Sequence, residues 1–305
     1  MKITAINNFN INFQNWKPNR FVSFKNNCAD EVIISTQPNF EEISKNYFKN
    51  HKGKFDISDY KNLSQTEVKA IDENIPKTVK DAAEHTYAIG KCFKNYLDDK
   101  YGKDNYMFIS IGTSPSGIGR VLEFSGVETK YLPLTGFRMS LDSLPKWINK
   151  YRNGVDHYID FLDSQGINKD LPQKTNKEII FADFVYSRST LNNFEYLLER
   201  EMNFPLYDKN VHILNLEEEL KHAFCREEQT DENKNMFNRF SKKYLLYGET
   251  AKYCGVPHLE LQDFDKFDPT KIKRKPLQKQ YNYEIIKRLD ADGEIEENPQ
   301  NRNSL

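Results

Sequence analysis

The chain has 305 residues and a mass of 36.0 kDa, and 38% of its residues are hydrophobic. Its 21 Phe and 17 Tyr supply enough apolar area for a core, which excludes a wholly disordered chain. The 44 basic and 45 acidic side chains give a formal charge of -1, which argues against bulk nucleic-acid binding. A mean hydropathy of -0.78, without a run of about 18 apolar residues, argues against a membrane-spanning chain.

Residues 1–75 are predicted to form an irregular and helical N-terminal extension. Val32, Ile33 and Ile34 form a short β-type run that is consistent with an edge strand. Ser64, followed three residues later by Glu67, is a capping-box pattern and predicts a helix start. The segment from Val79 to Leu97 has apolar residues close to a 3.6-residue period and predicts a long helix.

The cysteines and the start of the chain indicate a reducing compartment. The four cysteines lack a CxxC spacing, so we expect free thiols rather than disulfides; they are Cys28, Cys92, Cys225 and Cys254. Residues 1–12 lack the apolar stretch of a secretory signal peptide. We therefore expect a cytoplasmic protein, and export by a specialised route stays open.

A strand–loop–helix–strand unit is predicted over residues 107–134. Met107–Ile111 is a nearly continuous apolar run, as expected of a strand buried on both faces. Ile118, Val121 and Leu122 then follow at helical spacing, and Ser114 is the expected N-cap, with Pro115 at the first helical position. A second strand is expected over residues 129–134. Such a unit favours a parallel sheet.

A second unit with the same order of elements is predicted after a helical insertion at about 140–170. It has a strand at 179–182, a polar loop, a helix beginning near Leu191 and a strand at 211–214. Two further helices are expected over 216–227 and 231–253. The sequence thus predicts an α/β core over 76–260, mainly a parallel sheet flanked by helices, with helical N- and C-terminal additions. Residues 261–305 are expected to be a charged tail.

The loop of the first unit is a candidate anion site. It comes after a strand and opens a helix, where backbone N–H groups and the helix dipole favour negative charge. Small and hydroxyl-bearing residues let a phosphate approach the backbone; they are Gly112, Thr113, Ser114, Ser116 and Gly117. The alternative is a tight turn that only caps the helix.

The loop of the second unit carries a more specific pattern. Asp183 ends an apolar strand, and a hydroxyl-rich turn with Ser187, Ser189 and Thr190 leads into a helix. The stretch from Asp183 to Leu191 resembles the PRPP-binding motif of type I phosphoribosyltransferases. In that motif an apolar strand ends in two acids, and a Thr-Gly-x-Thr-like phosphate loop follows. The resemblance covers roughly residues 80–215.

The resemblance implies a phosphoribosyltransferase-like fold that binds a phosphorylated ribose or a nucleotide. It implies transfer or cleavage at the ribose C1 with Mg²⁺ and release of pyrophosphate. Asp183 would orient the ribose and contact the metal, and Tyr186 takes the position of an acid that assists transfer. Ser187, Arg188, Ser189 and Thr190 would hold the 5′-phosphate. The first loop would bind pyrophosphate, with Arg120 and Arg138 as basic residues nearby in sequence.

Several positions depart from the family pattern and keep other functions open. Ala182 stands in place of the first acid, and Arg188 stands in place of the usual glycine. A catalytically inactive nucleotide-binding module on the same fold is therefore one alternative. A sugar-isomerase-type phosphosugar-binding domain is another. A third is an effector or regulatory protein that binds a protein partner through its N-terminal helices or its tail.

Overall fold

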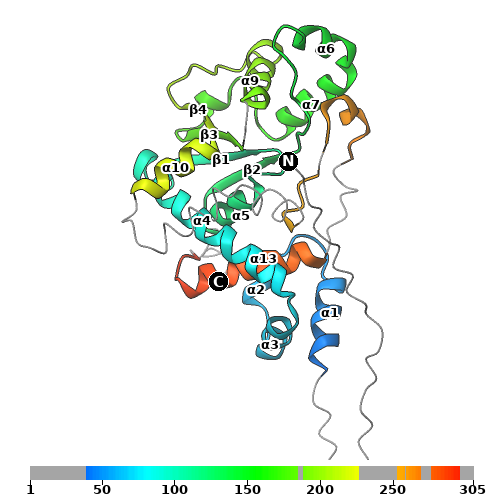
Figure 1. Cartoon of the computed structure of the whole chain (residues 1–305), viewed down its shortest axis with the longest axis vertical. Coiled ribbons are helices and arrows are strands. Elements are labelled where there is room, and N and C mark those ends of the chain that lie inside the picture. The colour runs from blue at the N-terminus through cyan, green and yellow to red at the C-terminus, as the bar shows by residue number, and fades with distance from the viewer. Residues whose placement is uncertain (1–38, 185–187, 227–252, 258, 269–275, 296–305) are drawn as a thin grey trace, which may run out of the picture. The chain divides into compact units, whose positions relative to one another are not determined.

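A parallel sheet lies at the centre of the computed structural model, which describes residues 39–184, 188–226, 253–257, 259–268 and 276–295. The strand order is β2-β1-β3-β4, and all neighbouring strands are parallel (Figure 1). The strands are β1 (Tyr106–Ile111), β2 (Glu128–Leu132), β3 (Glu178–Asp183) and β4 (Val211–Asn215). The α/β class and the parallel sheet are thereby confirmed.

Some predictions fall outside the described residues. They are the strand at Val32–Ile34, nearly all of the helix expected over 231–253, Cys28, and the candidate site residues Tyr186 and Ser187. Of the other cysteines, Cys92 and Cys254 are free and buried, as expected.

The order in which strands are added to the sheet reverses between β1 and β3. After β1 it passes through α5 (Ser116–Phe124) to β2 on one side. After β3 it passes through α9 (Ser189–Tyr196) and a short π-helical turn at 197–201 to β4 on the other side. In open parallel sheets this switch point is where ligands bind, outside the carboxyl ends of the strands. The register pairs Ser110 with Ala182, so the two loops begin beside each other.

Helices cover both faces of the sheet. On one face Ile109, Ile111 and Phe181 pack against the predicted insertion, which forms α6 (Leu144–Lys150) and α7 (Arg152–Ser164), and against α9. On the other face Phe108 and Ile180 pack against α4 (Lys77–Tyr101), α5 and α10 (Leu216–Arg226). A four-residue helix, α8 (Leu171–Lys174), precedes β3. Strand β1 is buried along its whole length, which accounts for the nearly continuous apolar run in its sequence.

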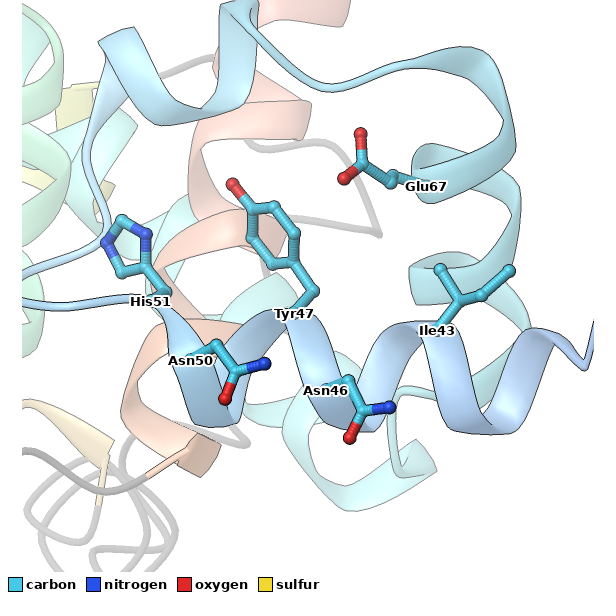
Figure 2. Close-up of a pocket in the computed structure, with 6 residues that line it drawn as sticks. All are labelled: Ile43, Asn46, Tyr47, Asn50, His51 and Glu67. Atoms are coloured by element: carbon cyan, nitrogen blue, oxygen red, sulfur yellow. The ribbon is translucent and has the colours of Figure 1, made fainter.

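A separate apolar cluster joins the N-terminal helices to the C-terminal region. Its helices are α1 (Phe40–Asn50), α2 (Ile57–Lys61), α3 (Gln65–Asn74) and α13 (Pro276–Ala291), packed beside α4 and α5. The predicted capping box is confirmed: the Ser64 N–H donates to Glu67 Oε2 at 2.9 Å, and the Glu67 N–H donates to Ser64 Oγ at 3.3 Å. A pocket of about 340 Å³ opens beside α1 and α3 (Figure 2).

The region expected to be a charged tail contains two packed elements. The 3₁₀ helix η3 (Leu261–Lys266) packs on α7, and α13 packs on α4. Tyr281 of α13 is fully buried, and its hydroxyl donates to Thr86 Oγ1 of α4 at 2.7 Å. The apolar and aromatic residues of α13 explain why this charged segment joins the core. None of the helices in the described ranges is long and apolar enough to cross a membrane.

Candidate functional site

The two predicted loops lie next to each other at the carboxyl edge of the sheet. The first loop follows β1 directly, and Asp183 is the last residue of the neighbouring strand β3. Both loops lead into helices, α5 and α9, whose N-termini begin at this edge. Residues about 70 positions apart in sequence therefore form one candidate site, which we call the switch-point site. Its described members are Gly112–Gly117, Asp183 and Arg188–Thr190.

Gly112 has a structural reason for being glycine. Its φ of 76° lies in the left-handed region, and its N–H donates to the Leu132 carbonyl at 2.8 Å. A Cβ at this position would lie 2.7 Å from the Leu134 carbonyl oxygen. A side chain would thus meet backbone that cannot rotate away. Gly112 lets the first loop cross closely over the segment that follows β2.

Helix α5 begins differently from the prediction. Ser114 is not the N-cap: the cap position belongs to Pro115, and the helix starts at Ser116 without a side-chain cap. Ser116 Oγ instead donates to the Thr113 carbonyl at 2.5 Å. Among the described residues, the N–H groups of Gly117 and Ile118 have no hydrogen-bond partner. The missing cap leaves these helix donors available to a ligand.

Thr113 adds a hydroxyl to these donors. Its side chain is only 4% exposed, and its Oγ1 has no hydrogen-bond partner within the described structure. An unpartnered buried hydroxyl costs free energy, so such a group is often found where a ligand or a water completes it. Ser114, by contrast, is half-buried at the tip of the loop.

The side chain of Asp183 is a buried carboxyl, and few neighbouring groups offset the cost of burying its charge. Asp183 lies on the same face of β3 as Ile179 and Phe181, because alternate residues of a strand share a face. Its side chain therefore points toward α9 and the connection after β2. Burial raises its pKa to about 8, and the Phe184 N–H and the charge of Arg138 only partly oppose this. At neutral pH the carboxyl is therefore mostly protonated, so that it is able to donate a hydrogen bond to a ligand rather than carrying a charge.

The segment that carries Arg138, whose charge acts on Asp183, is held by a residue that the sequence analysis missed. Asn193 of α9 is fully buried, and its Nδ2 donates to the carbonyls of Phe137 at 3.2 Å and Met139 at 3.1 Å. These bonds tie the segment that carries Arg138 to the helix that follows β3. The available signal was a polar residue beside Leu191 and Phe194, on the predicted apolar face of the helix.

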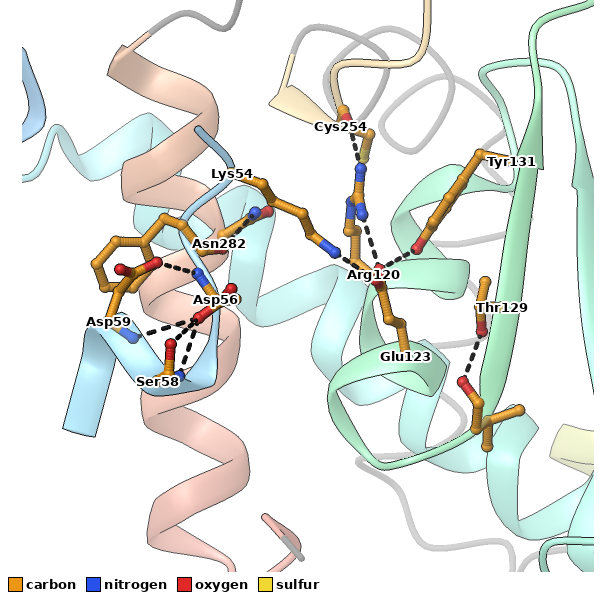
Figure 3. A network of polar contacts seen from close by, with 12 residues as sticks. Lys54, Asp56, Ser58, Asp59, Arg120, Glu123, Thr129, Tyr131, Cys254 and Asn282 are labelled. Carbon is orange, nitrogen blue, oxygen red and sulfur yellow. Dashed lines mark hydrogen bonds and ion pairs between the residues drawn. The ribbon is translucent and has the colours of Figure 1, made fainter. Parts of the chain in front are cut away.

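Arg120 lies away from the switch-point site, although it is close to the first loop in sequence. Its Nη1 donates to Glu123 Oε2 at 2.7 Å, and its Nη2 donates to the Cys254 carbonyl at 3.3 Å. Tyr131 donates to the same Glu123 oxygen at 2.8 Å, and Lys54 forms an ion pair with the other oxygen (Figure 3). Arg120 is thus occupied in a buried network and is not assigned to the switch-point site, which leaves Arg138 and Arg188 as the candidate basic residues at this edge.

Arg188 occupies a backbone conformation that favours glycine. It is the N-cap residue of α9, its φ is 53°, and its side chain is exposed. The sequence has an arginine here in place of the glycine of the family pattern, and this residue has the backbone conformation that glycine adopts most easily. A non-glycine residue in this region stores strain, and such strain is most often found at functional sites.

We predict that Arg188→Gly raises the free energy of unfolding by about 0.5–1 kcal/mol. The gain reflects relief of the left-handed strain, reduced by the greater entropy of glycine in the unfolded chain. Urea unfolding measures the change. Arg188→Ala is the matched control, because it removes the guanidinium and keeps the strain. If glycine is no more stabilising than alanine, the strain at this position is not significant.

The residues at this edge do not fit a resident Mg²⁺. Within the described ranges, no group of three or more His, Cys, Asp or Glu side chains is arranged to hold a metal ion. Asp183 is the one predicted metal ligand among the described residues of this edge. Mg²⁺ binding through the protein alone requires ionised oxygen ligands in octahedral geometry. We therefore assign no step to a metal held by this chain.

Comparisons of the chain with protein-family models, with curated proteins and with solved structures find no match.

Proposed function

We propose that the chain binds a phosphorylated ribose or a nucleotide at the switch-point site. The observation that carries this proposal is the pair of loops at the β1 and β3 ends, where the described structure leaves donors unpartnered. These donors are the N–H groups of Gly117 and Ile118 and the hydroxyl of Thr113. The chemistry of the site, rather than its fold, supports the proposal.

The donors suit a phosphoryl group. Backbone N–H groups at the start of α5, together with the helix dipole, favour an anion at this point. Since the whole chain carries a formal charge of -1, the attraction must come from such local groups and from the nearby arginines Arg138 and Arg188. Asp183 in its protonated form would donate a hydrogen bond to a ribose or phosphate oxygen without repelling an anion.

Two features favour binding over glycosyl transfer. Ala182 replaces the first acid of the family pattern, and its side chain is fully buried in the apolar cluster that faces α4 and α10. A carboxylate there would be desolvated without a partner. Asp183 is mostly neutral at pH 7, which suits a hydrogen-bond donor better than a metal-binding carboxylate. The transferase activity implied by the resemblance remains the alternative.

Calorimetric titration with AMP, ribose 5-phosphate and PRPP tests the proposal. We expect binding of at least one of these ligands, and Thr113→Val should weaken it about fivefold because one hydrogen bond is lost. Thr129→Val is the control, because its hydroxyl donates to the Val127 carbonyl just before β2, at the end of the strand opposite to the switch-point site. The proposal is wrong if none of the three binds, or if both variants weaken binding equally.

Further arms of the same titration separate the alternatives. Release of pyrophosphate from PRPP with added Mg²⁺ would establish transfer or cleavage in place of binding alone. Tighter binding of glucose 6-phosphate than of the ribose compounds would favour the phosphosugar-binding alternative.

A further inference from the structure

The pocket beside α1 and α3 has a defined set of polar and aromatic groups. Helix α1 presents four lining residues on one face, at positions i, i+3, i+4 and i+7, and Glu67 lies across from them on α3 (Figure 2). The α1 residues are Ile43, Asn46, Tyr47 and Asn50, and the C-cap residue His51 completes the lining. The opposite face of α1, with Phe48, is buried in the core.

One carboxylate, Glu67, lines this pocket, and a second, Asp59, acts on it from outside the lining. The pKa of Tyr47 is raised to about 12, most of all by burial and in addition by the charges of Asp59 and Glu67, so both carboxylates act on the tyrosine hydroxyl. His51 Nε2 lies 3.4 Å from Asp59 Oδ2, whereas Glu67 forms no ion pair within the described part of the chain. The nearby lysines point elsewhere: Lys54 pairs with Glu123, and Lys279 donates to the carbonyls of Phe48 and His51.

Glu67 and Tyr47 both have unused binding capacity. Glu67 Oε2 accepts hydrogen bonds from the Ser64 N–H at 2.9 Å and from its hydroxyl at 2.7 Å. In the described structure, Glu67 Oε1 and the Tyr47 hydroxyl have no hydrogen-bond partner. The Tyr47 ring stacks on His51 with a centroid separation of 6.0 Å. A half-buried carboxylate oxygen beside an aromatic ring is an arrangement that attracts ammonium and guanidinium groups.

We propose that this pocket binds an organic cation, with its ammonium or guanidinium group placed between Glu67 Oε1 and the Tyr47 ring. The side-chain amides of Asn46 and Asn50 are exposed at the rim and supply further acceptors. Such a cation has two sources, a free polyamine or a lysine or arginine side chain of a partner protein. This site is separate from the switch-point site, and the inference does not depend on the proposed function.

The role of Glu67 in the capping box allows a substitution that removes its charge without disturbing the helix. Glutamine at the third helical position also completes a capping box, so Glu67→Gln removes the charge and keeps the helix start. Glu73→Gln is the matched control, because Glu73 is exposed on the same helix and does not line the pocket. Thermal unfolding of both variants checks that α3 stays folded.

Titration of the full chain with spermidine, and separately with acetyl-lysine amide and acetyl-arginine amide, tests the inference. We expect binding of at least one probe, weakened about tenfold by Glu67→Gln and unchanged by Glu73→Gln. Spermidine alone would indicate a free polyamine, whereas binding of the amino-acid amides would indicate a partner side chain. Failure of all three probes, or equal effects of the two variants, would overturn the inference.

Discussion

Glu123→Ala is expected to lower the free energy of unfolding by about 3–5 kcal/mol, the usual result of removing one partner of a buried ion pair. Glu123 accepts hydrogen bonds from Arg120, Tyr131 and Lys54, and Arg120 is 7% exposed. Without the carboxylate, the Arg120 and Lys54 charges lose their counter-ion inside the protein. Urea unfolding followed by circular dichroism measures the loss.

Glu128→Ala is the control for this experiment. Glu128 pairs with Lys177 at 3.2 Å, but its side chain is 44% exposed, so its removal should cost less than about 1 kcal/mol. Burial by itself raises the pKa of Glu123, but Arg120 and Lys54 outweigh burial and hold this pKa below its usual range. The stabilisation from Glu123 is therefore present at neutral pH and lost as the pH falls through its folded-state pKa. Equal losses in the two variants would contradict the burial of this network.

Asp183→Asn is expected to stabilise the protein at pH 7, by about 2–4 kcal/mol. The pKa of Asp183 rises from an ordinary value of 3.8 to about 8 because the fold buries it. Because the pKa of Asp183 is higher in the folded chain, its protonated form contributes fully to stability at low pH. This contribution is lost as the pH rises to about 8. The wild-type chain should thus lose stability between about pH 4 and pH 8, and the variant should lose less.

Urea unfolding at several pH values between 4 and 9 measures this difference. Asp142→Asn, at an exposed position in the connection after β2, is the control and should leave the pH dependence unchanged. Parallel curves for wild type and Asp183→Asn would show that Asp183 is not desolvated. A carboxyl retained at a cost in stability is typical of a functional site, so this experiment also bears on the switch-point site.

The sequence predicts the sheet and the position of the two loops for physical reasons. Strands buried on both faces need continuous apolar runs, which is why β1 and β3 are evident in the sequence. Parallel strands joined by helices place their loops at one edge, so the meeting of the first loop with Asp183 follows from topology. The Ser64–Glu67 capping box is predictable because all of its contacts are local.

The features that the sequence did not predict depend on contacts between distant residues. The local sequence marks Asn193 as a polar residue on an apolar face but does not show which segment it holds, nor that Arg120 turns toward Glu123 and Cys254. Serine is a common N-cap residue, but Ser114 does not cap α5, and the Ser116 hydroxyl donates to the Thr113 carbonyl. The raised pKa of Asp183 likewise depends on how closely the fold surrounds it, which a single sequence does not reveal.

The packing of α13 has a consequence for the order of folding. Tyr281 bonds to Thr86, Tyr283 to Asp72 and Asn282 to the Phe55 carbonyl, across separations of 195, 211 and 227 residues. Contacts this distant in sequence form slowly, because a long loop must close before they contribute. During synthesis, α1 to α3 emerge long before α13, so the apolar surface that α13 covers stays open until α13 has been made. The N-terminal helices are therefore the part of this core most exposed to chaperones and to aggregation while the chain is being made.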